Sequence, residues 1–177
     1  MISGALLGDF VKGPLRGGFH QSLEHGIRLH RRIDAFSDSD ALLSAYRRQL
    51  TPDLHRYSSI ITDVVFDYHL SRHWQQFHEQ TLRHFADSVY AALADRQHDF
   101  PLTARRFSAH MIEQDLLLHY GQWPVIDRVL KSIAARLPHD NPLQQGSTVI
   151  NTHQDLLQQA FFDFYPRVVT MAQSYRS

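Results

Sequence analysis

The sequence predicts a single all-α domain spanning residues 1–177. Between the turns, apolar residues recur mainly at spacings of three and four, which is the period of a helix with one buried face. Seven prolines divide the chain into segments of helical length, because a helix interior tolerates proline poorly. No segment repeats with a period of about 20–50 residues, which argues against a solenoid. A chain of this length can bury a sizeable core without disulfides.

The first two expected helices, at 2–11 and 20–36, are separated by the loop "KGPLRGG". The first is short and apolar. The second is amphipathic, as expected for a helix that packs on one side. Its inward face is expected to consist of Leu23, Ile27, His30 and Asp34.

The turn "SDSD" at 37–40 is expected to end the second helix and to offer Ser37 or Ser39 as the N-cap of a helix at 41–50. A long apolar helix is expected at 57–77. Its β-branched residues would also suit a strand, but its apolar stripe continues in helical register to Trp74. The remaining helices are expected at 81–94, 102–120, 125–135 and 148–174, the last of them kinked before Pro166.

Composition excludes several classes of function. Lys and Arg total 18, as do Asp and Glu, so the formal net charge is zero and no broad binding of nucleic acids or membrane surfaces is expected. The absence of Cys excludes thiolate metal sites and thiol nucleophiles, and it is consistent with the cytoplasm. The sequence has no apolar run of about 18 residues that would span a membrane, and its start lacks the basic residues of a signal peptide.

The segment "GIRLHRRID" places two ionisable groups on an apolar helix face. His30 and Asp34 are four residues apart and therefore share a face, while Arg31 and Arg32 point to either side. Ionisable groups on an inward face need a partner or a metal. Taken alone, the motif is most simply explained by a His–Asp hydrogen bond with both arginines in solvent.

The segment "TDVVFDYHLSRHW" is the second concentration of ionisable groups. Asp63 and Asp67 are four residues apart on one face, and His69 and His73 are four apart on the neighbouring face. Buried carboxylates this close repel each other unless a cation lies between them. Carboxylates with imidazole, and no Cys, suit Mn²⁺, Fe²⁺, Zn²⁺ or Mg²⁺. The alternative is one buried ion pair with an arginine.

The third segment, "LLGDFVKG", provides Asp9 at the end of the first helix and Lys12 in the loop. Asp9 is either a further carboxylate of a metal site or a polar residue that ends the helix. Together the three segments predict a metal site that hydrolyses a phosphate ester, because a metal activates water and cationic side chains bind phosphate. The phosphate-binding candidates are Lys12, Arg31, Arg32 and Arg72.

Four segments resemble, in this order, motifs of the bacterial acyl carrier protein phosphodiesterases. They are "GALLGDFVKG", "GIRLHRRID", "TDVVFDYHLSRHW" and "FFDFYPR", and the resemblance extends over about residues 3–172. It implies an all-α fold distantly similar to the HD-domain metal phosphohydrolases. It also implies that holo-acyl carrier protein is hydrolysed to apo-carrier and 4′-phosphopantetheine with Mn²⁺, or with Mg²⁺ as the alternative.

The resemblance also assigns roles to residues of this chain. It implies Asp34, Asp63 and His69 as the groups that activate water. The implied metal ligands are Asp9, His30, Asp34, Asp63 and Asp67. Family members carry a further N-terminal segment rich in Leu, Ala and His, whereas this chain begins almost at "LLGDF". That difference predicts either a start codon assigned too late or a site that lacks one His ligand.

Two alternative functions are compatible with these segments. One is an HD-type nucleotide phosphohydrolase, and the other is a helical module that binds the carrier protein without catalysis. For either carrier-protein function, the acidic partner requires a basic surface. The arginines expected to form it are Arg16, Arg28, Arg31, Arg32, Arg47 and Arg48.

Overall fold

The computed structural model describes residues 1–176, and every regular element in that part of the chain is a helix. The predicted all-α class is therefore confirmed. No helix among these residues is both long and apolar enough to cross a membrane. The α-helices are α1 (Ile2–Leu7), α2 (Gln21–Ser39), α3 (Ala41–Arg47), α4 (Ser58–Arg72), α5 (Trp74–Phe77), α6 (Leu82–Arg96), α7 (Leu102–Glu113), α8 (Leu116–His119), α9 (Trp123–Ala134) and α10 (Gln154–Arg176). The 3₁₀ helices are η1 (Pro52–Tyr57), η2 (Gln97–Asp99) and η3 (Pro142–His153).

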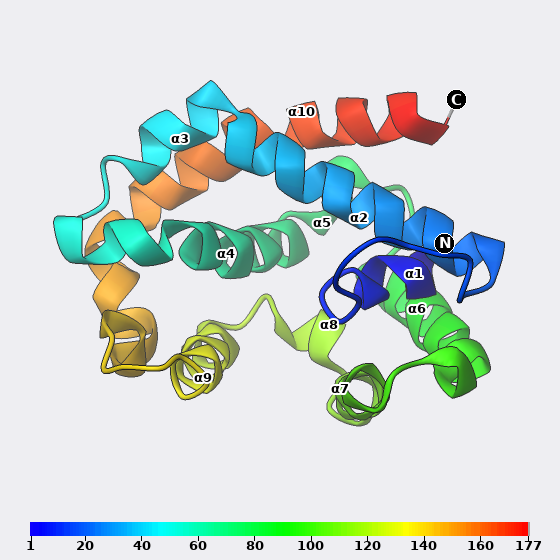
Figure 1. The fold of residues 1–177 in the computed structure, drawn as a ribbon. Helices are drawn as coiled ribbons and strands as arrows, with labels where there is room; N and C mark the ends of the chain where they lie inside the picture. The colour runs from blue at the N-terminus through cyan, green and yellow to red at the C-terminus, as the bar shows by residue number, and fades with distance from the viewer. Residues whose placement is uncertain (177) are drawn as a thin grey trace.

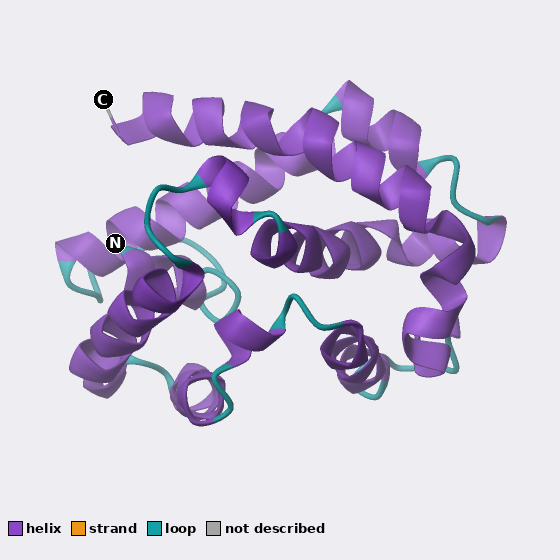
Figure 2. Ribbon diagram, turned by 180° about the vertical axis from the view of Figure 1, so that it is seen from behind, coloured by secondary structure: helices purple, strands orange, loops and turns teal. Residues whose placement is uncertain are grey.

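The helices are arranged around α4. Figure 1 shows α2 and α10 crossing one side of the molecule, with α4 beneath them and α7 and α9 on the opposite side. Figure 2 shows the same arrangement from behind. Helix α10 contacts both α2 and α4, so it joins the N-terminal and central parts of the chain.

Two apolar clusters form the core. One is built mainly from α4, α9 and η3 and includes the fully buried Ile61 and Ile126. The other joins α1, α2, α6 and α7 and includes Leu23. Between α4 and α10 lie aromatic rings, among them the fully buried Phe161. The three segments predicted to carry the chemistry belong to α1, α2 and α4, so they are drawn from both clusters.

Helices α1 and α2 touch through their backbones. A Cβ atom on Gly4 would lie 2.2 Å from the carbonyl oxygen of Leu23, and one on Gly26 would lie 2.7 Å from the Cα of Gly4. A side chain at either position would push the helices apart, so glycine is needed for this close approach. At the next turn, a Cβ on Gly8 would lie 2.1 Å from the ring of His30. The contact therefore sets the distance from the end of α1 to His30.

The prediction that a turn at 37–40 ends the second helix is wrong. Helix α2 continues to Ser39, and the N-cap of α3 is Asp40, whose carboxylate accepts a 2.9 Å hydrogen bond from the backbone N–H of Leu43. The same buried carboxylate lies 2.6 Å from Arg167 of α10. Asp40 is favoured over the serines because a buried carboxylate can accept from both partners, and a charged partner strengthens the bond. The Ser39 hydroxyl instead donates to the carbonyl of Ala35.

Three expected helices have different bounds in the structure. The first ends at Leu7, and a turn rather than a helix carries residues 8–11. The helix expected at 57–77 breaks at His73 between α4 and α5. The helix expected at 102–120 breaks at Asp115, which has a left-handed backbone (φ 49°) and pairs with Arg83.

The C-terminal helix, expected at 148–174, begins later in the structure. Residues 142–153 form the 3₁₀ helix η3, which contains Gly146 at φ 61°, and α10 begins only at Gln154. Pro166 lies inside α10, which continues on both sides of it.

Replacing Gly4 with Ala is expected to reduce the free energy of unfolding by about 1–3 kcal/mol, the usual effect of overpacking. Helix propensity alone predicts the opposite result, because Ala is more favourable than Gly in a helix by about 1 kcal/mol. Urea unfolding followed by circular dichroism measures the effect. Gly18→Ala is the control, because no atom lies within 4 Å of a Cβ at that position. Equal stability of the two variants would show that α1 does not depend on the close contact.

Candidate active site

His30 is at the centre of the first half of the site. Its Nε2 atom lies 3.1 Å from Oδ2 of Asp34 and 3.5 Å from Oδ1 of Asp9. The helical repeat of α2 supplies Asp34, and the turn after α1 supplies Asp9. The imidazole is 22% exposed, whereas the carboxylates of Asp34 and Asp9 are 59% and 71% exposed. The face predicted to point inward is therefore buried at Leu23 and Ile27 but not at His30 and Asp34. The group is open to solvent and to a large substrate.

The three side chains influence one another's ionisation. Contact with Asp9 raises the pKa of His30 above its usual value, and contact with His30 lowers the pKa of Asp9. The pKa of Asp34 is raised despite its shorter distance from His30, because partial enclosure by protein outweighs the attraction of the imidazolium. His30 is therefore more readily protonated than a free imidazole.

Asp63 and Asp67 form the second half of the site on α4. Both residues are exposed, and the prediction that they are buried is wrong. Their carboxylates nevertheless have protein around them on several sides, and this enclosure raises the pKa of Asp63 to about 6 and that of Asp67 to about 7. The charge of Asp63 raises the pKa of Asp67 further. Water reaches both groups, and both titrate close to neutral pH.

The two halves lie within electrostatic range of each other. Besides enclosure, the negative charges of Asp34, Asp38 and Asp9 raise the pKa of Asp63, and Asp9 also acts on Asp67. The five predicted metal ligands are therefore linked by contacts around His30 and by charge effects that extend from Asp9 and Asp34 to Asp63 and Asp67. Asp38 belongs to the same group but was missed, because residues 37–40 were interpreted as a turn. The spacing of four residues from His30 to Asp34 to Asp38 is the signal that could have identified it.

Two cations lie at the edges of this acidic region. The charge of Lys12 adds to the effect of His30 in lowering the pKa of Asp9. Arg47 lowers the pKa of Asp63 against the effect of enclosure, and its guanidinium donates a 2.9 Å hydrogen bond to the hydroxyl of Thr62. Sequence reasoning placed Arg47 only on the docking surface, because its proximity to α4 depends on the packing of α3.

The other predicted phosphate-binding residues lie elsewhere. Arg31 donates a 2.6 Å hydrogen bond to the carbonyl of Val11, so it fastens the loop before Lys12 to α2. The guanidinium of Arg32 lies 5.4 Å from the ring centroid of Tyr175. That of Arg72 lies 5.8 Å from the centroid of Tyr68. Of the four predicted residues, Lys12 is the one that the contacts described here place among the carboxylates.

His69 lies in the core rather than in the acidic region. Its side chain is 5% exposed and stacks on Phe161 with ring centroids 5.6 Å apart. Desolvation lowers the pKa of His69 to about 4, so the ring is neutral at pH 7. Asp67 and His69 are two residues apart on a helix and therefore point about 200° apart around it. The structure does not bring His69 to the groups whose water it was expected to activate.

The donor set suits a divalent cation by its chemistry. Among residues 1–176, no three His, Asp, Glu or Cys side chains stand together as metal ligands would. Carboxylate oxygens with one imidazole are nevertheless the ligands of Mn²⁺ and Mg²⁺, and Asp63 and Asp67 repel each other where they stand. Asp9 and Asp34 have exposed side chains, which change rotamer readily. A cation bound among these carboxylates would relieve their repulsion.

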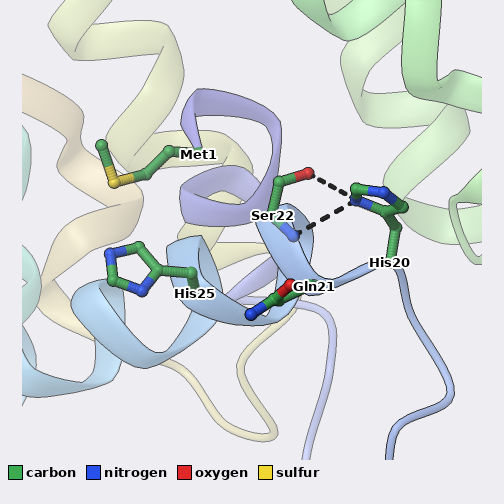
Figure 3. A pocket seen from close by; sticks show the side chains of 5 residues that line it. All are labelled: Met1, His20, Gln21, Ser22 and His25. Carbon is green, nitrogen blue, oxygen red and sulfur yellow. Dashed lines mark hydrogen bonds between the residues drawn. The ribbon is translucent and has the colours of Figure 1, made fainter.

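One pocket lies away from these groups. It has a volume of about 590 Å³ at the start of α2 and is lined by Met1, His20, Gln21, Ser22 and His25. Figure 3 shows His20 bonded to Ser22 on one side and His25 below Met1 on the other. His25 precedes His30 by five residues, so the two side chains point about 140° apart around the helix. We therefore place the chemistry at the carboxylates.

Comparisons with known proteins agree on one family. The family model described as acyl carrier protein phosphodiesterase matches residues 1–168. A protein of that name from an Enterobacter species is 31% identical over 174 residues, which is 98% of this chain and 90% of the relative. One from Yersinia pestis is 31% identical over 97% of this chain and 90% of its own. One from Pectobacterium atrosepticum is 29% identical over 98% and 90%.

No solved structure matches the chain. The expected similarity to HD-domain phosphohydrolases therefore stays a prediction.

In the absence of metal, Asp67→Asn is expected to raise the melting temperature at pH 8 and to leave it nearly unchanged at pH 4. The pKa of Asp67 is about 7 in the folded chain and 3.8 is its ordinary value. Between these values the native state binds more protons than the unfolded state, so the contribution of Asp67 to stability falls as the pH rises. Thermal unfolding in EDTA from pH 4 to pH 8 measures the difference from wild type.

Asp155→Asn provides the control, because Asp155 is an exposed acid at the start of α10. The raised pKa of Asp67 would be contradicted if the melting temperatures of wild type and Asp67→Asn differed by the same amount at every pH.

Proposed function

This chain belongs to the acyl carrier protein phosphodiesterase family, and we propose that it hydrolyses the phosphodiester joining 4′-phosphopantetheine to a serine of holo-acyl carrier protein. The products are apo-carrier and 4′-phosphopantetheine. The supporting observation is that the charges of Asp9 and Asp34, which contact His30, act on Asp63 of α4. The exposure of these carboxylates suits a substrate that is itself a folded protein.

Asp63 is our candidate for the general base. Its pKa of about 6 keeps much of it ionised at neutral pH and still basic enough to take a proton from water. The water oxygen forms a bond to phosphorus as the bond from phosphorus to the serine oxygen breaks. The serine oxygen takes up one proton, which balances the proton that Asp63 accepts. Asp34, whose pKa is also raised, is the second candidate for this role.

We propose that the cofactor is Mn²⁺, with Mg²⁺ as the alternative. A divalent cation bound here would lower the pKa of a water and offset the charge of the phosphoryl oxygens. The residues that would hold it are Asp9, His30, Asp34, Asp63 and Asp67. Lys12 and Arg47 add positive charge at the edges of the acidic region. Because a carboxylate has two oxygens, Asp63 can serve both as ligand and as base.

The acidic carrier requires a basic surface near this site. Of the six arginines expected there, Arg28 pairs with Glu24, Arg31 bonds to the backbone of Val11, and Arg47 is only 11% exposed. We therefore propose Arg16, Arg32 and Arg48, which are exposed, as the arginines that contact the carrier. We expect the reaction to take place in the cytoplasm.

Asp63→Asn and Asp67→Asn are each expected to lower the rate of holo-carrier hydrolysis by at least about 100-fold, in the range usual for loss of a general base. The assay is mass spectrometry of the carrier, which detects the loss of 4′-phosphopantetheine. Metal content measured on the same samples separates loss of ligand from loss of base. Asp155→Asn is the matched control and should retain wild-type activity.

Three results would overturn the proposed function. Wild-type protein with Mn²⁺ that leaves holo-carrier intact would exclude the reaction. Turnover of nucleotides in preference to holo-carrier would favour the nucleotide phosphohydrolase. Tight binding of carrier with no bound metal and no turnover would favour the non-catalytic module.

Gly8→Ala is expected to lower activity about tenfold or more and to reduce stability as well. The new methyl group would lie 2.1 Å from the ring of His30 and 2.8 Å from its Cβ, so the ring must rotate and α1 must also move slightly away from α2. Rotation would separate His30 from Asp9 and Asp34. Activity, Mn²⁺ affinity by calorimetry and the melting temperature should be compared with those of Gly18→Ala. Unchanged Mn²⁺ affinity and rate would contradict a role for the position of His30.

A further inference from the structure

A second pocket, of about 270 Å³, lies where α4 ends and α5 begins. Its walls include Ser71, Arg72, Trp74, Gln75, Gln76 and Leu82. Ligand pockets for compact drug-sized molecules usually have about 300–1,000 Å³. A pocket of this volume suits one narrow chain better than a nucleotide.

The pocket has a defined framework. Helix α4 ends at His73, whose φ of −110° and ψ of 19° redirect the chain into α5. The indole N–H of Trp74 donates a 2.7 Å hydrogen bond to the carbonyl of Gln80, which fixes the connection toward α6. The amide of Gln76 lies 3.3 Å from Nδ1 of His73. These contacts orient Trp74 and Gln76, two of the residues that line the pocket.

Two observations connect this pocket to the carboxylates. Ser71 follows Asp67 by four residues, so it lies on the same face of α4, about 6 Å further along the axis. Partial burial and the charge of Asp67 raise the pKa of Tyr120 to about 12, which places Tyr120 near Asp67. The next residue, Gly121, lies beside Ser71: a Cβ on it would be 3.5 Å from the Cβ of Ser71, which is ordinary van der Waals contact. The connection between α8 and α9 thus passes beside both the acidic region and the pocket.

The lining differs in chemistry from the acidic region. It offers the guanidinium of Arg72, a hydroxyl, two primary amides and an imidazole beside Trp74 and Leu82, and none of these described wall residues is acidic. These groups can bond the carbonyl oxygens of a chain that carries amide groups, and the two apolar residues can contact an apolar branch. The pantetheine arm has two secondary amides and a dimethyl branch and starts at the phosphate. Gln75 and Gln76 can bond its amides, and Trp74 and Leu82 can contact its methyl groups.

We infer that this pocket is the subsite for the pantetheine arm of the substrate, with the phosphodiester held at Asp63 and Asp67. The inference rests on the proposed function. In this arrangement the arm runs along α4 from Asp67 past Ser71. The carrier protein then leaves from the opposite side of the phosphate, toward α2. Recognition of the arm is thereby separated from the chemistry by one helical turn.

The test uses the double variant Gln75→Leu/Gln76→Leu, which removes both amides and keeps the side-chain size. The KM for holo-carrier is expected to rise about tenfold, with kcat within about threefold, because the lost hydrogen bonds are distant from phosphorus. Binding of pantetheine, which lacks the phosphate, is measured by calorimetry on the same proteins and should weaken about tenfold. Gln158→Leu, an exposed glutamine of α10, is the matched control.

A second variant, Ser71→Leu, fills the pocket instead of removing its polar groups and should also weaken pantetheine binding. It keeps the test decisive if the double variant does not fold. Wild-type pantetheine affinity and KM in a folded variant would overturn the subsite while leaving the phosphodiesterase function intact. A wild-type chain that fails to hydrolyse holo-carrier would overturn the proposed function, and calorimetry with pantetheine would still show whether the pocket binds the arm.

Discussion

The backbone contact between α1 and α2 is the constraint on which the first half of the site depends. Gly4 and Gly26 let the two helices approach so closely that a single methyl group on either would collide with backbone atoms. That approach brings the turn after α1 to His30, with Asp9 3.5 Å from the imidazole. The bond from Arg31 to Val11 then holds the following loop, and with it Lys12, on the same helix. One packing contact thus positions a carboxylate, an imidazole and a cation.

The second half of the site depends on how α4 packs in the first apolar cluster and against α10. Its buried face carries Ile61 and Val65, while its exposed face carries Asp63 and Asp67 toward α2. Enclosure by protein raises the pKa values of Asp63 and Asp67, and repulsion by neighbouring carboxylates raises them further. Proteins tolerate such an arrangement mainly where function requires it. The ion pair between Asp40 and Arg167 joins the start of α3 to α10 and so helps to hold these helices around the site.

Much of this arrangement followed from helical spacing in the sequence. Residues four apart share a helix face, so the pairs His30–Asp34 and Asp63–Asp67 could be identified from order alone. Spacing says nothing of which face is buried, and His69 was therefore assigned to the site although it packs on Phe161. Spacing also does not determine the direction in which a long side chain extends, and for this reason Arg32 and Arg72 were expected near the phosphate. The role of Gly26 and of the glycines in "GALLG" could not be predicted from the sequence, because it depends on the packing of α1 against α2.

The shortness of α1 links ligand binding to local opening. Six residues are too few to form a stable helix alone, so α1 owes its order to packing on α2. If α1 separates from α2, Asp9 leaves the site while His30, Asp34 and the two acids of α4 remain. Any ligand that needs Asp9 must therefore also hold α1 down, and its binding energy includes the energy of docking that helix. The amides of α1 would then exchange with solvent at a rate that reports how fully the site is assembled.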